Sequence, residues 1–180
     1  MKKTILLIAC CVLFSGAFAQ KKSCTVQFGF KAGLNHCVIN GAETSGEKTG
    51  FTGTTGYGAF FSEIPIGSTT FLQNELLFTW TNDWHFIEIP LYLKQALNNK
   101  WSVLLGPKLD IVADKFDKTD GNTSDLLGVS VETGTQFSFS KRIFVEGRYS
   151  IGLSKQFKDP FFDINEGRRN NLRFGIGLRF

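Results

Sequence analysis

The stretch NNLRFGIGLRF, residues 170–180, alternates an apolar residue with a polar residue or glycine and ends the sequence on Phe180. Alternation with a period of two is typical of a β-strand that presents two different faces. Chain ends are usually polar and frayed, so an apolar strand that finishes on an aromatic residue is unusual for a water-soluble protein. The stretch therefore favours a strand whose apolar face meets lipid.

Similar alternation recurs about eight times along the chain, at residues 26–35, 50–63, 72–80, 87–94, 101–111, 129–139, 143–153 and 172–180. The connections are alternately short and long, with residues 36–49, 113–125 and 154–169 as the long ones and the brief residues 81–83 as an exception. In transmembrane barrels the short turns face the periplasm and the longer loops face outside. The sequence predicts an all-β fold, namely an eight-stranded antiparallel up-and-down transmembrane β-barrel with short periplasmic turns and longer extracellular loops.

The apolar face of each predicted strand is expected to point toward lipid, and in residues 50–63 this face contains Tyr57, Ala59 and Phe61. The opposite faces would then bring charges of both signs into the lumen. Because buried charges are costly unless paired, we expect them to form a structural network. A selective narrow channel or proton path is the alternative, although aqueous pores usually have more strands. The predicted lumen residues are Lys31, Glu75, Glu88, Lys94, Lys108, Asp110, Glu132, Glu146, Arg148, Arg173 and Arg179.

Tryptophans fall at the two ends of the predicted strands. Trp80 and Trp84 lie at the loop end of a hairpin, whereas Trp101 lies at a turn end. This distribution is typical of the two aromatic girdles of a membrane barrel. Phe180 is the expected signal for the barrel-assembly machinery. A soluble lipid-binding barrel would share the same alternation with its polar face in water, and it stays open as an alternative.

The amino terminus has the pattern of a secretory signal peptide. A basic MKK precedes the apolar run TILLIACCVLF and the small residues of Ala17-Phe18-Ala19. We expect cleavage after residue 19, which leaves residues 20–180 as the outer-membrane barrel domain. A retained anchor and a lipoprotein box that ends at Cys10 are the alternatives.

Charge and cysteine usage narrow the possible functions. Loss of Lys2 and Lys3 with the signal peptide lowers the formal net charge from +4 to +2, which argues against a nucleic-acid partner. Cys24 and Cys37 would remain in the mature chain. If both flank one strand they lie roughly 40 Å apart, so we predict no bond between them.

The sequence contains no nucleophile elbow, phosphate loop or zinc spacing, so we expect no catalysis, cofactor or metal. Asp83, Trp84 and His85 form a rim constellation that a hydrolase could use, and His36 is expected at the same rim. The segment with Asp114, Asp117 and Asp120 lacks the closing glutamate of an EF-hand loop, so calcium binding is not expected there.

Several motifs resemble the PorT-like outer-membrane β-barrel family of Gram-negative bacteria: FGFKAGLN, LQNELLF, IEIPLYLK, LLGPKLDI, VEGRYSIGL and LRFGIGLRF. The resemblance implies an eight-stranded barrel in the outer membrane, and some members of that family are linked to secretion or gliding machinery. It implies no reaction. We expect a structural or interaction role through extracellular loops that meet a protein partner or lipopolysaccharide. The alternatives are a porin-like channel, a secretion accessory barrel, a rim hydrolase and a soluble lipid-binding barrel.

Overall fold

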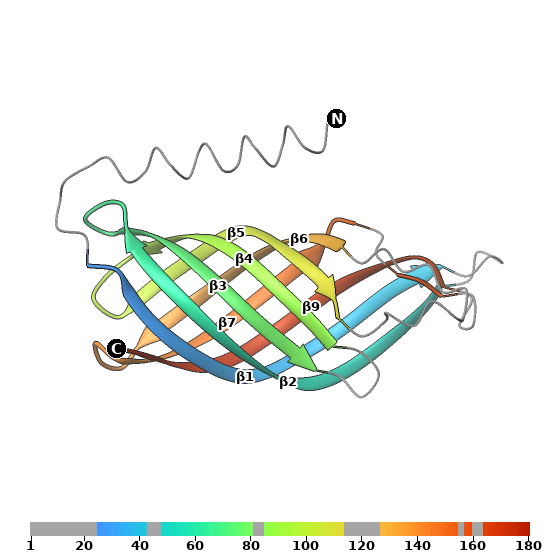
Figure 1. Cartoon of the computed structure of the whole chain (residues 1–180), viewed down its shortest axis with the longest axis horizontal. Coiled ribbons are helices and arrows are strands. Elements are labelled where there is room, and N and C mark those ends of the chain that lie inside the picture. Colours follow the sequence, from blue (N-terminus) through green and yellow to red (C-terminus); the bar gives the residue numbers. More distant parts are fainter. Residues whose placement is uncertain (1–24, 43–47, 81–84, 114–126, 155–156, 160–163) are drawn as a thin grey trace.

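The computed structural model describes residues 25–42, 48–80, 85–113, 127–154, 157–159 and 164–180, which form a barrel of tilted strands (Figure 1). No helix occurs among these residues. In particular, they include no helix long and apolar enough to cross a membrane. The strands are β1 (Gln27–Ala42), β2 (Lys48–Pro65), β3 (Thr70–Trp80), β4 (His85–Ala96), β5 (Trp101–Val112), β6 (Leu127–Ser138), β7 (Ile143–Gly152), β8 (Phe157–Asp159) and β9 (Ile164–Arg179).

Each strand pairs antiparallel with the next, from β1 to β7, and then β7 pairs with β9. Antiparallel pairing of β1 with β9, from Gly29–Arg179 to Ala42–Asn165, closes the barrel. Eight strands therefore form the barrel wall, and the predicted fold class is confirmed. The three-residue β8 lies beside β9 and was not expected from the sequence.

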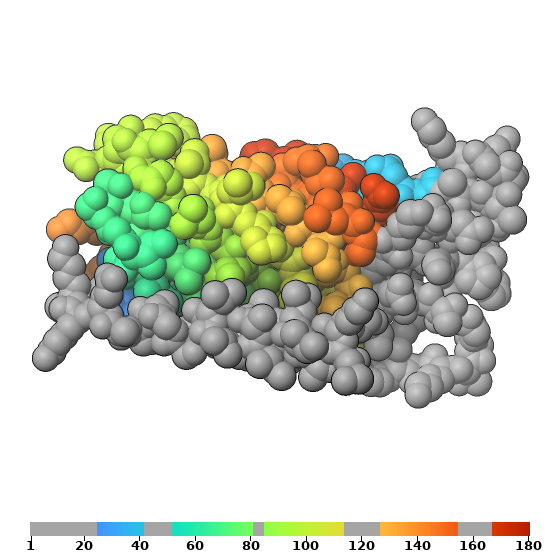
Figure 2. Space-filling view, turned by 90° about the horizontal axis from the view of Figure 1, so that it is seen from above, coloured from blue at the N-terminus to red at the C-terminus, as the bar shows by residue number. Residues whose placement is uncertain are grey.

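The polar faces of the strands point inward and the apolar faces point outward. The charged side chains on these faces are almost fully buried; Lys108 and Glu88 have no exposed surface. By contrast, Phe60 is 64% exposed and Leu105 is 58% exposed on the outer wall. Figure 2 shows the outer side chains of β3 to β7 as one continuous surface. This inversion of the usual burial pattern is what a lipid-facing barrel requires.

The inward and outward faces of β2 are the reverse of the predicted ones. Tyr57, Ala59 and Phe61 are buried in the lumen, and Phe60 faces outward. The expected lipid face of this strand was therefore wrong. The lumen has room for these aromatic side chains because glycines lie opposite them. An added Cβ at Gly175, for example, would lie 2.0 Å from the Tyr57 hydroxyl oxygen.

Tight turns connect the strands at one end of the barrel, at residues 66–69, 97–100 and 139–142. Their backbones are tied by hydrogen bonds such as those from Ile66 N to Thr70 O, at 3.0 Å, and from Leu97 N to Trp101 O, at 2.9 Å. Short turns mark the periplasmic end of an outer-membrane barrel, so the opposite end is extracellular.

Three strands extend past the others at the extracellular end. β1, β2 and β9 contain 16, 18 and 16 residues, whereas β3 to β7 contain 10 to 12. They project from the wall on the side away from the tight turns (Figure 1). We call this sheet of β2, β1, β9 and β8 the projecting sheet.

The projecting sheet corrects two of the predicted loops. Residues 36–42 and 48–49 belong to β1 and β2, and residues 164–169 belong to β9. Backbone pairing of β1 with β2 continues to Ala42–Lys48 although the sequence there is more polar, because ladder hydrogen bonds do not depend on the side chains. Of the third predicted loop, residues 114–125 lie outside the described residues.

Candidate functional site

The middle of the lumen contains a group of charged side chains that we call the central network. It holds five cations and five anions, and their side chains are at most 4% exposed. The members are Lys31, Lys108, Arg148, Arg169, Arg173, Glu75, Glu88, Asp110, Glu132 and Glu146. Alternation on seven strands brings these residues together, because every second side chain of a barrel strand points inward.

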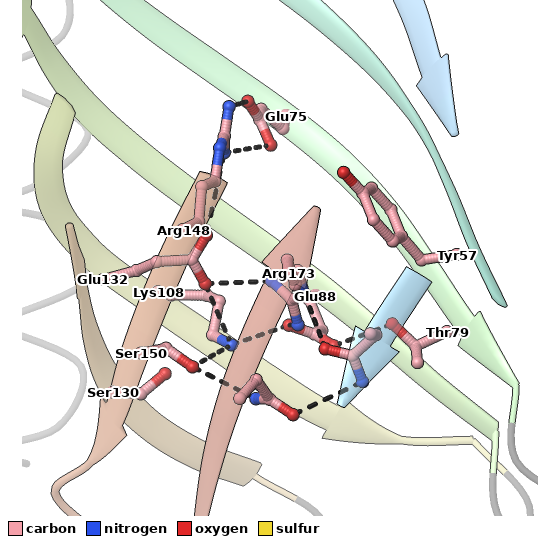
Figure 3. Close-up of polar contacts among 12 residues, drawn as sticks. Tyr57, Glu75, Thr79, Glu88, Lys108, Ser130, Glu132, Arg148, Ser150 and Arg173 are labelled. Carbon is pink, nitrogen blue, oxygen red and sulfur yellow. Dashed lines mark hydrogen bonds and ion pairs between the residues drawn. The ribbon is translucent and has the colours of Figure 1, made fainter. Parts of the chain in front are cut away.

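Arg148 organises the periplasmic half of the central network. Its two terminal nitrogens donate to both oxygens of Glu75, at 3.0 and 2.9 Å, in the fork geometry seen in Figure 3. Arg148 Nη2 also donates to Glu146 at 2.7 Å. Lys31 Nζ contacts the same two carboxylates, at 2.7 Å from Glu75 and 2.8 Å from Glu146. Two cations and two anions thus neutralise one another in a small buried volume.

Glu88 organises the extracellular half. Its carboxylate accepts from Lys108 Nζ at 2.7 Å and from Arg173 Nη2 (Figure 3). It also accepts from Arg169 Nη2 at 3.1 Å. Glu132 joins the two halves, because it lies 2.9 Å from Arg173 Nη1 and 3.7 Å from Arg148 Nη1. The charges therefore form one connected set and not separate pairs.

Neutral side chains complete the partners of the carboxylates. The hydroxyl of Tyr92 donates to Glu132 at 2.6 Å, and that of Tyr57 donates to Glu146 at 3.1 Å. The Arg148 guanidinium also lies 4.6 Å from the centre of the Tyr92 ring. Buried ionic groups are stable only when their remaining donors and acceptors are also satisfied, so these hydroxyls are part of the network.

The extracellular end of the lumen is apolar. Cys37, Ile39, Phe86 and Val112 form a buried cluster there. Arg169 lies below it, with its guanidinium 3.8 Å from the centre of the Phe86 ring and its Nε donating to Cys37 Sγ at 3.4 Å. Cys24 lies outside the described residues, so the absence of a Cys24–Cys37 bond stays a prediction.

At the periplasmic end, Glu63, Lys94 and Arg179 form a smaller cluster, which we call the periplasmic triad. Lys94 Nζ donates to Glu63 at 2.6 Å, and Arg179 Nε lies 3.3 Å from the same carboxylate. One anion therefore serves two cations. The three side chains are 10% exposed or less.

In the structure, all of the predicted lumen residues lie inside the barrel. Glu63 and Arg169 lie there too, although they were not among the predicted residues. A signal for each was present. Glu63 continues the two-residue step of Tyr57 and Phe61, so it marks the inward face of β2. Arg169 lies four residues before Arg173, so it shares the inward face of β9, but it falls within the predicted loop of residues 154–169.

The other predicted site residues are spread over the surface. Trp80 and Trp101 are 51% and 46% exposed near opposite ends of the barrel. Phe180 is 72% exposed; its N donates to Phe28 O at 3.0 Å, and its ring lies 6.3 Å from that of Phe30. Asp83 and Trp84 lie outside the described residues, as do Asp114, Asp117 and Asp120.

The two histidines lie on separate strands. His85 begins β4 and is exposed, whereas the half-buried His36 has Nδ1 2.8 Å from Thr54 Oγ1. Within the part of the chain that the structure describes, no cluster of His, Cys, Asp and Glu could hold a metal ion. Ion pairs between strands tie the walls of the barrel together, and internal cations engage the carboxylates of the central network.

A closed barrel with a lipid-facing apolar wall and a charged lumen defines a small outer-membrane protein. The profile of the outer membrane protein beta-barrel domain matches residues 6–180, and the chain belongs to that family. The family places the chain in the outer membrane. No curated protein matches the sequence.

Solved structures with a similar fold include those of two bacterial surface proteins. One is Ail, the attachment invasion locus protein of Yersinia pestis, in complex with the heparin analogue sucrose octasulfate; the TM-score is 0.55 at 12% identity, over 86% of this chain and 99% of that chain. The other is Neisserial surface protein A, with a TM-score of 0.54 at 14% identity over 87% of this chain and 99% of that chain. At these identities the likeness concerns the fold alone.

Proposed function

We propose that this protein is a non-catalytic interaction barrel that binds a protein partner outside the cell through its projecting sheet. The observation that carries the proposal is the unequal length of the strands. β1 and β2 pair over sixteen positions, from Gln27–Glu63 to Ala42–Lys48, which is more than a tilted strand needs to cross a bilayer.

The projecting sheet has an edge suited to a partner. Among the described residues, β2 pairs with β3 only from Gly56 onward, so residues 48–55 pair on one side with β1 alone. A strand edge of this kind can add an extended segment of another chain. The outward residues at this edge include Thr52 and Thr54, both exposed.

Site-specific photo-cross-linking tests this proposal in intact cells. A photoreactive residue at Thr52, on the β2 edge, is expected to give a discrete cross-linked protein species. The matched control is Leu105, which is 58% exposed on the lipid-facing wall. No discrete species from position 52, or the same species from position 105, would contradict an interaction site on the projecting sheet.

A shortened hairpin tests the same proposal through binding. Ile39 pairs with Phe51, so joining them through a two-residue Asn-Gly turn removes residues 40–50 without a change of register. We expect this variant to keep the gel shift between unheated and boiled samples while it loses the partner found by cross-linking. Full retention of that partner by a correctly folded variant would refute the role of the projecting sheet.

A narrow channel is the second candidate function, and the filled lumen disfavours it. The central network and the apolar cluster occupy successive levels between the two mouths. An eight-stranded barrel is just wide enough for its side chains to fill. Purified protein in planar bilayers is therefore expected to give flat current traces, and reproducible single-channel steps would restore the channel hypothesis.

Several finer expectations stay predictions. These are cleavage after residue 19, the role of Phe180 as an assembly signal, contact with lipopolysaccharide, and membership of the narrower PorT-like family. Ail, crystallised with a heparin analogue, is an example of a barrel of this fold with a bound ligand, and it supports a binding role here by analogy of fold.

A further inference from the structure

We propose a second binding site at the periplasmic mouth, a blind pocket that takes the carboxylate or phosphate group of a small organic anion. This site lies at the opposite end of the barrel from the projecting sheet and is independent of the function proposed above. A pocket of about 370 Å³ opens there, with the periplasmic triad and residues of two tight turns in its lining.

The charge of the pocket lining favours an anion. Among the described residues that line it are the cations Lys94, Arg179 and Lys100, against one carboxylate, that of Glu63. Lys94 is 3% exposed and Arg179 is 9% exposed, so both cations lie where water screens them weakly. The central network above is balanced, with five charges of each sign, so the excess of positive charge in this part of the lumen belongs to the pocket.

The bonds of the periplasmic triad leave its cations incompletely neutralised. Glu63 accepts from Lys94 Nζ at 2.6 Å, whereas its contacts with Arg179 Nε are longer, at 3.3 and 3.4 Å. Among the described residues, the other hydrogen bonds of these two cations go to neutral oxygens: Lys94 donates to Gln136 at 3.0 Å and Arg179 Nη1 to Ser138 at 3.5 Å. The Arg179 guanidinium also lies 4.5 Å from the centre of the Phe144 ring. A planar guanidinium with one weakly held carboxylate is a natural partner for a second carboxylate or a phosphate.

The rest of the pocket lining suits a polar molecule of modest size. Ser68, Thr69, Asn98 and Asn99 lie around the mouth and offer hydroxyl and amide groups. Asn98 Oδ1 accepts from the backbone N of Lys100 and of Trp101, both at 2.8 Å, which fixes the amide and leaves its NH₂ group as a donor. The pocket volume is at the small end of the usual range for ligand sites, so the ligand is a small anion and not a long chain.

Calorimetric titration of the full-length protein, folded in detergent at low ionic strength, tests this inference. The probes are inorganic phosphate, succinate and a soluble digest of peptidoglycan, which separate a free anion from a carboxylate of the cell wall. We expect wild type to bind at least one of them with a defined stoichiometry. Lys94→Met with Arg179→Gln is expected to weaken that binding at least tenfold.

Glu63→Gln is the decisive variant, because Glu63 competes with the ligand for the same cations. Its removal is expected to tighten anion binding severalfold, a gain that a merely structural role would not produce. Lys141→Gln is the matched control: it removes an exposed charge from a turn at the same end, outside the pocket lining. The gel shift between unheated and boiled samples confirms the fold of each variant.

Three results would overturn the inference. The first is no binding of any probe to wild type. The second is binding by Glu63→Gln that is no tighter than wild type. The third is an equal loss in Lys141→Gln, which would mean that the general positive charge of this end attracts anions without a pocket.

Discussion

Arg148→Met is expected to lower the free energy of unfolding by about 3–5 kcal/mol, the usual cost of breaking a buried ion pair by removing one partner. Arg148 neutralises Glu75 through two hydrogen bonds and Glu146 through a third. Without it, Lys31 would be the one cation among the described residues left in contact with the two buried carboxylates, whose other donors, Gln73 and Tyr57, are neutral. Urea titration in lipid vesicles, followed by tryptophan fluorescence, measures the change.

The matched control is Lys141→Met, which also removes one cation but from an exposed turn. We expect its effect to stay within about 0.5 kcal/mol. A cost for Arg148→Met as small as that of the control would contradict the view that the central network holds the barrel walls together.

Gly177→Ala is expected to destabilise the barrel by about 1–3 kcal/mol through overpacking. An added Cβ at this position would lie 2.1 Å from Phe144 Cζ. Phe144 cannot move freely, because its ring packs edge-on against Phe61 at 5.6 Å and lies beside the Arg179 guanidinium at 4.5 Å. The same urea titration applies.

A second substitution tests the cause. Phe144→Leu combined with Gly177→Ala is expected to cost less than the sum of the two single changes, because the smaller side chain makes room for the methyl group. Gly147→Ala serves as the control on the lipid side, where the nearest atom to an added Cβ is 3.4 Å away, on the Phe174 ring. Strictly additive costs, or an equally large cost of Gly147→Ala, would show that overpacking against Phe144 is not the cause of the destabilisation.

The sequence predicted the inward face wherever a charge and an apolar run alternate. In β5, Gly106, Lys108 and Asp110 are predicted on the inward face, and Leu105 and Leu109 on the outward face. The structure has that arrangement. The pattern is informative because a charged side chain on the lipid face costs several kcal/mol, so a charged residue marks the inward face of its strand.

Strand β2 shows where this signal ends. Tyr57 and Phe61 are apolar enough for lipid, yet Tyr57 fills the lumen against Gly175 and Phe61 fills it against Gly29. Complementarity of large and small residues across a barrel depends on the shear and tilt of the wall, which alternation along one strand does not contain. Only Glu63, two residues beyond Phe61, could have corrected the assignment.

The projecting sheet was missed for a different reason. Residues 164–169 are mostly polar, and residues 36–42 place the apolar Val38 and Ile39 side by side, so neither segment has the regular alternation of the membrane-crossing strands. Outside the bilayer a strand has no need of a uniformly apolar face, so pairing with an existing neighbour decides the structure. Because Arg169 falls in this region, the central network predicted from the sequence lacked one of its five cations.

The most direct test of the account is cell fractionation followed by gel mobility of unheated and boiled samples in detergent. We predict a band in the outer-membrane fraction that shifts on boiling, since a closed barrel held by its interstrand ladder and central network resists detergent until heated. A soluble band with no shift would contradict a lipid-facing barrel, because the polar faces would then lie in water and the apolar faces in a core.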